Sequence, residues 1–64
     1  MANYVVHRIQ REERFGIFEI GGKRHLFGEK FESAGDAFSF LRVKHADQSV
    51  SVSRVHANWL VYLT

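Results

Sequence analysis

The side chains that could do chemistry in this 64-residue chain are four histidines and seven carboxylates, with serine or threonine as the available nucleophiles. Cysteine is absent, which excludes thiolate nucleophiles, disulfide bonds and thiolate metal ligands. The chain contains no Gly-x-Ser-x-Gly, His-Glu-x-x-His or P-loop pattern. A chain this short also leaves little room for a pocket that encloses a substrate. We therefore expect a protein that is not an enzyme and has no catalytic residues.

The histidines do not predict a metal site. They are His7, His25, His45 and His56. No two have the i, i+3 or i+4 spacing of ligands on one helix face, or the i, i+2 spacing of ligands on one strand face. Only His7 and His25 could come together across strands. We expect neither a metal nor another cofactor.

The segment Gly21-Gly22-Lys23-Arg24 has two interpretations. Glycine N–H groups and two cations could converge on a phosphate. Alternatively, the paired glycines supply the positive φ angles of a two-residue hairpin turn, and the charges after them are solvated. The hairpin turn is the interpretation that we favour.

The net charge is only +2, and the whole excess lies in residues 1–30. Six basic residues face four acids there, whereas three face three in residues 31–64. Aromatic residues alternate with the basic ones in the first half, and such a surface can neutralise phosphates and stack on bases. The candidate nucleic-acid-binding residues are Arg8, Arg11, Lys23 and Arg24.

The clearest single element in the sequence is a helix whose first residues can be identified. Ser33 is a good N-cap, with Asp36 three positions later as in a capping box. The helix is expected to end at Lys44 or His45, where basic side chains suit its C-terminal end. At 100° per residue, one face of this helix should lie on a sheet. That face comprises Ala34, Ala37, Phe38, Leu41 and His45.

Most other segments have the composition of strands. Before the helix, strands are expected over residues 3–10, 15–20 and 23–27, with residue 31 as the alternative end of the last one. After it, residues 49–53 alternate valine with serine, and residues 59–63 form an apolar closing strand. The sequence thus predicts one domain, residues 1–64, of class α+β. We expect a small, mainly antiparallel β-sheet with one helix packed on one face, in the order β-β-β-α-β-β.

Two features indicate association. The closing strand is apolar on both faces, and two apolar helix residues point away from the expected sheet. A 64-residue domain without disulfides also has a small core, which oligomerisation often supplements. The candidate interface residues are Phe40, Val43, Trp59 and Tyr62.

Residues 4–41 resemble the arm-type DNA-binding domain at the N-terminus of tyrosine recombinases. That family has three antiparallel strands and then a helix opened by Phe-x-(Ser/Thr)-x-x-(Glu/Asp)-Ala and followed by Phe-Leu. The matching residues here are Phe31, Ser33, Asp36, Ala37, Phe40 and Leu41. The resemblance implies DNA binding through the sheet by the four basic candidates. The chain departs from the family in its two strands after the helix and its lack of a recombinase core.

These observations leave two hypotheses of different class. The first is a small interaction module, a homodimer, that acts by binding a larger protein; a phage, prophage or plasmid origin would fit such a chain. The second is a nucleic-acid-binding accessory or regulatory protein that uses the basic N-terminal hairpin. No apolar run approaches the roughly 18 residues of a membrane span, and no signal-peptide pattern opens the chain. We expect a cytoplasmic protein without membrane contacts.

Overall fold

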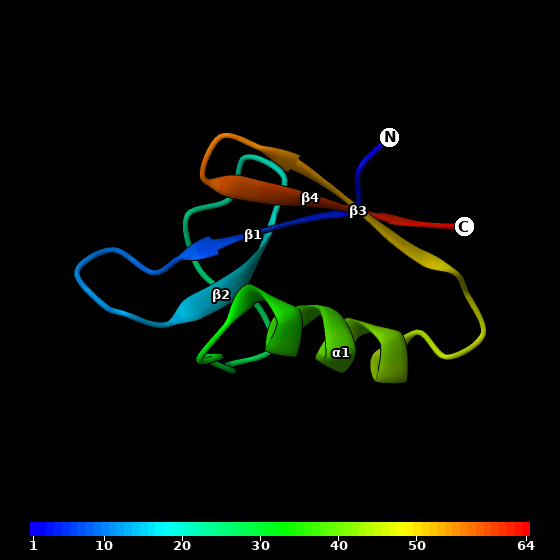
Figure 1. Ribbon diagram of the computed structural model, residues 1–64, viewed down its shortest axis with the longest axis horizontal. Coiled ribbons are helices and arrows are strands. Elements are labelled where there is room, and N and C mark those ends of the chain that lie inside the picture. The colour runs from blue at the N-terminus through cyan, green and yellow to red at the C-terminus, as the bar shows by residue number, and fades with distance from the viewer.

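The computed structural model describes all 64 residues and confirms the α+β class (Figure 1). Two strands, β1 (Tyr4–Arg8) and β2 (Phe15–Glu19), precede the helix α1 (Ala34–Lys44). Two more, β3 (Val50–Val55) and β4 (Asn58–Leu63), follow it. The four strands form one antiparallel sheet in the order β2-β1-β4-β3, and α1 lies along one face of it. The element order is therefore β-β-α-β-β.

The prediction of a third strand over residues 23–27 is wrong. That segment follows the outer edge of β2 and meets it only through two isolated bridges, His25 with Phe18 and Phe31 with Phe15. Between the bridges, Phe27 and Gly28 have φ angles of 63° and 62°. Extended strands need negative φ, so two consecutive left-handed residues interrupt the pairing. Residues 23–27 therefore have the composition of a strand but do not form one.

The glycine pair does make a turn, but this turn does not join two strands of the sheet. The Gly22 N–H donates to the Glu19 carbonyl over 2.9 Å, and Gly21 between them has a φ of 80°. Positive φ at the third residue of a four-residue turn is typical of a type II turn, which favours glycine there. The chain regains contact with β2 only at His25.

The helix begins as predicted. The Ser33 hydroxyl accepts a hydrogen bond of 3.1 Å from the Asp36 backbone N–H, with Ser33 in an extended conformation. The reciprocal bond of a full capping box, from the Ser33 N–H to the Asp36 carboxylate, does not form. The helix ends at Lys44, and His45 caps it with an N–H bond to the Leu41 carbonyl. Local sequence thus sets both ends of α1.

The two strands after the helix form a tight hairpin. Val55 pairs with Asn58 across the two-residue turn His56-Ala57, and Val50 pairs with Leu63 at the other end. As the alternating pattern predicted, Val50 and Val52 pack toward the core, and Ser51 and Ser53 are exposed. Beyond the hairpin, Ser49 and Thr64 exchange two backbone hydrogen bonds. The last residues are therefore tied into the sheet.

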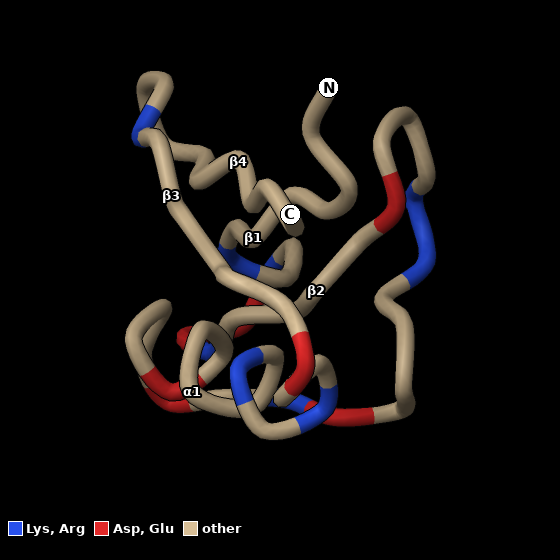
Figure 2. The backbone as a smooth tube through the Cα atoms, turned by 90° about the vertical axis from the view of Figure 1, so that its right-hand side faces the viewer, with Lys and Arg blue, Asp and Glu red and all other residues tan.

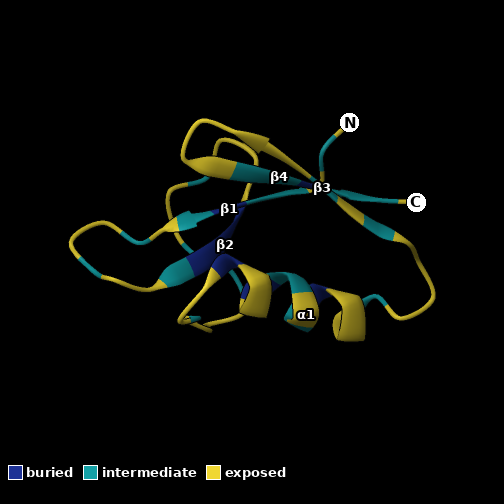
Figure 3. Cartoon of the chain, in the orientation of Figure 1, coloured by how far each residue is buried: buried dark blue, intermediate teal, exposed yellow.

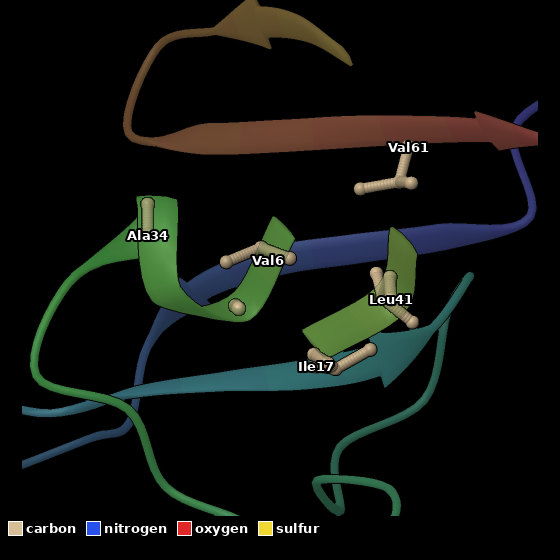
Figure 4. Packing of buried hydrophobic residues seen from close by; sticks show 6 residues of the cluster. Val6, Ile17, Ala34, Leu41 and Val61 are labelled. Carbon is tan, nitrogen blue, oxygen red and sulfur yellow. The ribbon is translucent and has the colours of Figure 1, made fainter. Parts of the chain in front are cut away.

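A small core lies between the sheet and the helix (Figure 4). Its members are Val6, Ile17, Ala34, Ala37, Leu41 and Val61. Only eight of the 64 residues are buried, and most of the chain in Figure 3 has the colours of exposed or intermediate residues. The accessible surface is 4537 Å², slightly above the roughly 4,200 Å² expected for a compact monomer of this mass. The fold therefore leaves much apolar surface only half covered.

Candidate interaction surfaces

The sheet has one face covered by α1 and one face that the helix does not touch. Because side chains alternate along a strand, the neighbours of the buried Val6 and Val61 point to the uncovered side. Val5, Leu60 and Tyr62 lie there, half-buried, with Val5 directly opposite Leu60 in the register. We call this side of the four-stranded sheet the open face.

An aromatic cluster of one strand residue, His7, and one loop residue, His25, covers Phe18 on one part of the open face. The His7 ring stacks on the Phe18 ring with centroids 4.0 Å apart, and His25 meets the same ring edge-on at 6.4 Å. Phe18 is consequently buried, with 4% of its surface exposed. The β1–β2 side of the open face therefore carries a small aromatic cluster, and the β4–β3 side remains bare.

The bare part of the open face carries no ionised side chain, and its apolar members are Val5, Val55, Leu60 and Tyr62. A hollow of about 350 Å³ is lined by Val5 and Leu60 from the strands and by Ile20, Gly21 and Gly22 from the turn after β2. Ile20 and Val55 are 54% and 43% exposed. Arg54 is the single Lys, Arg, Asp or Glu in residues 49–64, and the charged positions in Figure 2 gather on the helix and the loops. This surface suits contact with an apolar partner more than with an ionic one.

The four basic candidates do not form one surface. The Arg8 guanidinium donates to the Glu12 carbonyl over 3.2 and 2.9 Å, which ties it to its own hairpin turn. Arg11 is exposed in that turn, with a φ of 66°. Lys23 and Arg24 instead line a hollow of about 340 Å³ beside the aromatic cluster. Only the last two therefore flank aromatic side chains on the open face.

The four interface candidates are also spread over separate surfaces. The Phe40 ring packs against Phe27 and Phe31, with centroids 5.4 and 5.3 Å away, so it is half-buried. Val43 is 80% exposed on the outside of α1. Trp59 lies on the helix side of the sheet, edge-on to Phe15 and Phe38. Tyr62 alone belongs to the open face.

Sequence reasoning did not single out Arg54. Its guanidinium lies 4.9 Å from the centre of the Trp59 ring, and its Nε donates to the His56 carbonyl over 3.1 Å. Arg8, Arg54 and Trp59 line a hollow of about 350 Å³ at the end of the sheet. The two-residue turn at His56-Ala57 places Arg54 opposite Trp59. A hairpin prediction with that loop length would have found the pair.

The histidines do not converge on a common site. His7 and His25 do meet, but around Phe18 rather than around a common ligand. No three His, Asp or Glu side chains are close enough to hold a metal ion. The Gly22 N–H, which a phosphate would need, is already bonded to Glu19. The sole ion pair, Lys30 with Glu12 at 3.0 Å, is exposed at the hairpin turn.

No protein-family model, curated protein or solved structure matches this chain. None of its helices has the length and apolar character needed to cross a membrane.

Proposed function

We propose that this protein is a non-enzymatic interaction module that works as a homodimer and binds a larger protein through its open face. The bare apolar strip of β1, β4 and β3 carries the proposal. Val5, Leu60 and Tyr62 lie half-buried on it, and Val55 on the same side is 43% exposed. Exposed apolar surface that is contiguous in this way is typical of protein-binding sites.

The small core supports the same proposal. Seven apolar residues are buried, and eight further apolar residues, including Tyr4 and Trp59, are only partly covered around the core. Covering a half-exposed valine or leucine releases about 25 cal/mol for each Å² of apolar surface removed from water. Association therefore supplies stability that a 64-residue core lacks.

The partner is expected to present an uncharged apolar surface. The open face of β3 and β4 consists of Ser51, Ser53, Val55, Asn58, Leu60 and Tyr62. None of these side chains is ionised, so a partner bringing a charge into the strip would lose its hydration without gaining an ion pair. A helix or strand of the partner fits this surface if its contacting face is apolar and is flanked by small polar or amide side chains.

A matched pair of variants tests the open face. Leu60→Lys places a charge in the middle of the strip, whereas Val43→Lys places the same charge on the exposed outside of α1. Partners from the source cell are captured on each variant and identified by mass spectrometry. We expect one partner to be retained by wild type and by Val43→Lys and lost by Leu60→Lys. Equal capture by both variants, with both folded by circular dichroism, would contradict the proposal.

Nucleic-acid binding is the second candidate, and one observation favours it. Lys23 and Arg24 line the hollow that also holds His7, His25 and Phe18, which places two cations beside stacked rings. Cations and aromatic faces together bind single strands. A mobility shift at two salt concentrations tests this, because phosphate contacts weaken as salt rises. Binding that is lost in Lys23→Ala/Arg24→Ala, and kept in the equally charged control Arg42→Ala/Lys44→Ala, would favour this candidate over the first.

A further inference from the structure

The two edges of the sheet differ in whether their backbone groups are used. At the β2 edge, Phe15 exchanges two hydrogen bonds with Phe31, of 2.7 and 2.8 Å, and the Leu26 N–H donates to the Ile17 carbonyl over 2.6 Å. The segment that was expected to be a third strand therefore covers this edge. The opposite edge, β3, has β4 on one side and no strand on the other.

The register shows which groups of β3 are free. Ser49 and Thr64 exchange two backbone hydrogen bonds, of 3.0 and 3.1 Å. Because such pairs alternate in an antiparallel ladder, Ser51, Ser53 and Val55 also bond to β4. Val50, Val52 and Arg54 then direct their N–H and C=O groups away from the sheet. Three residues in alternation present the hydrogen-bonding pattern that an added strand requires.

β3 also lacks most of the features that block edge pairing. Natural edge strands are shielded by charged side chains, above all lysine, and by proline, bulges or short length. β3 is six residues long, pairs in continuous register from Val50 to Val55 and contains no lysine or proline. Its one charged side chain, Arg54, lies against the Trp59 ring next to the turn. An edge strand with so little shielding is a template for pairing with another strand.

We propose that two copies of this chain join antiparallel through β3, forming a continuous eight-stranded sheet. This inference rests on the homodimer in the proposed function and assigns its surface. The two-fold axis passes through Val52, so Val52 of one copy faces Val52 of the other. Val50 then faces Arg54 of the second copy, and Ser51 faces Ser53. A like-charge pair, Arg54 opposite Arg54, arises only if the register slips, and such pairs destabilise a sheet.

The arrangement also explains the half-covered valines. Val50 and Val52 lie on the helix side and are half-buried in one chain. Their counterparts from the second copy cover the remaining apolar surface. A two-fold axis perpendicular to the sheet keeps both helices on one face and joins the two open faces into one on the other. The dimer thus presents a doubled binding surface to the larger partner.

A proline at position 54 tests the backbone contacts. Arg54→Pro removes an N–H that makes no bond within the chain, and Arg54→Ala removes the same side chain but keeps the N–H. We expect wild type and Arg54→Ala to be dimers by light scattering, and the dimer dissociation constant of Arg54→Pro to rise by about tenfold or more. Circular dichroism verifies that Arg54→Pro is folded.

Cysteine cross-linking tests the register without relying on proline. Non-hydrogen-bonded pairs in antiparallel strands have Cα atoms about 4.5 Å apart, within the range of a disulfide. The chain has no cysteine of its own. Oxidised Ser51→Cys/Ser53→Cys should give a covalent dimer, whereas Ser51→Cys and Ser53→Cys alone should not, since each serine faces the other one.

The outcomes separate the two proposals. A wild-type monomer over a wide concentration range would overturn both the edge pairing and the homodimer. A dimer that survives Arg54→Pro and gives no cross-link in any cysteine variant would overturn the edge pairing alone. In that case Leu60→Lys should break the dimer, which would assign it to the open face. Cross-linking by a single-cysteine variant would overturn the register centred on Val52.

Discussion

The Cβ atom of His25 lies over the backbone of Gly16, where a side chain on the glycine would meet it at 2.9 Å. Phe18 and Ile9 would approach that side chain to 3.1 and 3.2 Å. The chain can therefore fold His25 back onto the sheet only because residue 16 has no side chain. This contact holds the connection between β2 and α1 against the β1–β2 half of the open face.

Replacing Gly16 tests how tightly that connection is packed. We expect Gly16→Ala to lower the free energy of unfolding by about 1–3 kcal/mol, as overpacking does in other cores. The control is Gly35→Ala, in the exposed first turn of α1, where the nearest atom is 3.7 Å away. That change should stabilise the helix by about 0.5–1 kcal/mol. Urea denaturation gives both values, and equal effects would show that His25 is not held in place.

The helix cap predicts a second difference. Ser33→Ala removes the acceptor for the Asp36 N–H and should cost about 1 kcal/mol of stability. Ser39→Ala, in the exposed middle of the same helix, should be neutral or slightly stabilising, because alanine has the higher helix propensity. Thermal unfolding followed by far-ultraviolet circular dichroism compares the two variants. A cost for Ser39→Ala as large as that for Ser33→Ala would contradict the capping role.

A third prediction concerns the bond between the first strand and the end of the helix. The Tyr4 hydroxyl and Nε2 of His45 lie 3.1 Å apart, in a partly buried contact between β1 and the residue that caps α1. Tyr4→Phe should destabilise the fold by about 0.5–1.5 kcal/mol. Tyr62→Phe loses a hydroxyl with no partner in the chain and should change stability by less than about 0.5 kcal/mol. Denaturation at matched protein concentrations measures both, and the bond is refuted if the two variants are equally stable.

The fourth prediction separates the two apolar residues on the flank of α1. Phe40→Ala removes a half-buried ring from contact with Phe27 and Phe31 and should cost about 1–2 kcal/mol, below the cost at a fully buried site. Val43→Ala, at an 80% exposed position, should change stability by less than about 0.5 kcal/mol. Light scattering on both variants adds a second readout. If Val43→Ala lowers the molecular mass, the outside of α1 belongs to the dimer interface.

Local sequence signals determined the helix and the final hairpin. Ser33 supplies a cap to a residue three positions away, and the alternation over Val50–Val55 settles which side chains face the core. Both depend on neighbours within a few positions, which is the range over which propensity and periodicity act. The basic and interface candidates also came from local patterns, and these patterns do not say which face or edge each residue reaches.

Tertiary structure alone decided the conformation of residues 23–31. Their composition predicted a strand, yet Phe27 and Gly28 adopt left-handed angles and the segment pairs with β2 only at two isolated bridges. Tertiary contacts stabilise this conformation. His25 packs over Gly16, and Phe27 and Phe31 pack against Phe40. These contacts join residues far apart in sequence, so no local pattern contains them. They cover the β2 edge, partly bury Phe40 and leave β3 as the uncovered edge of the sheet.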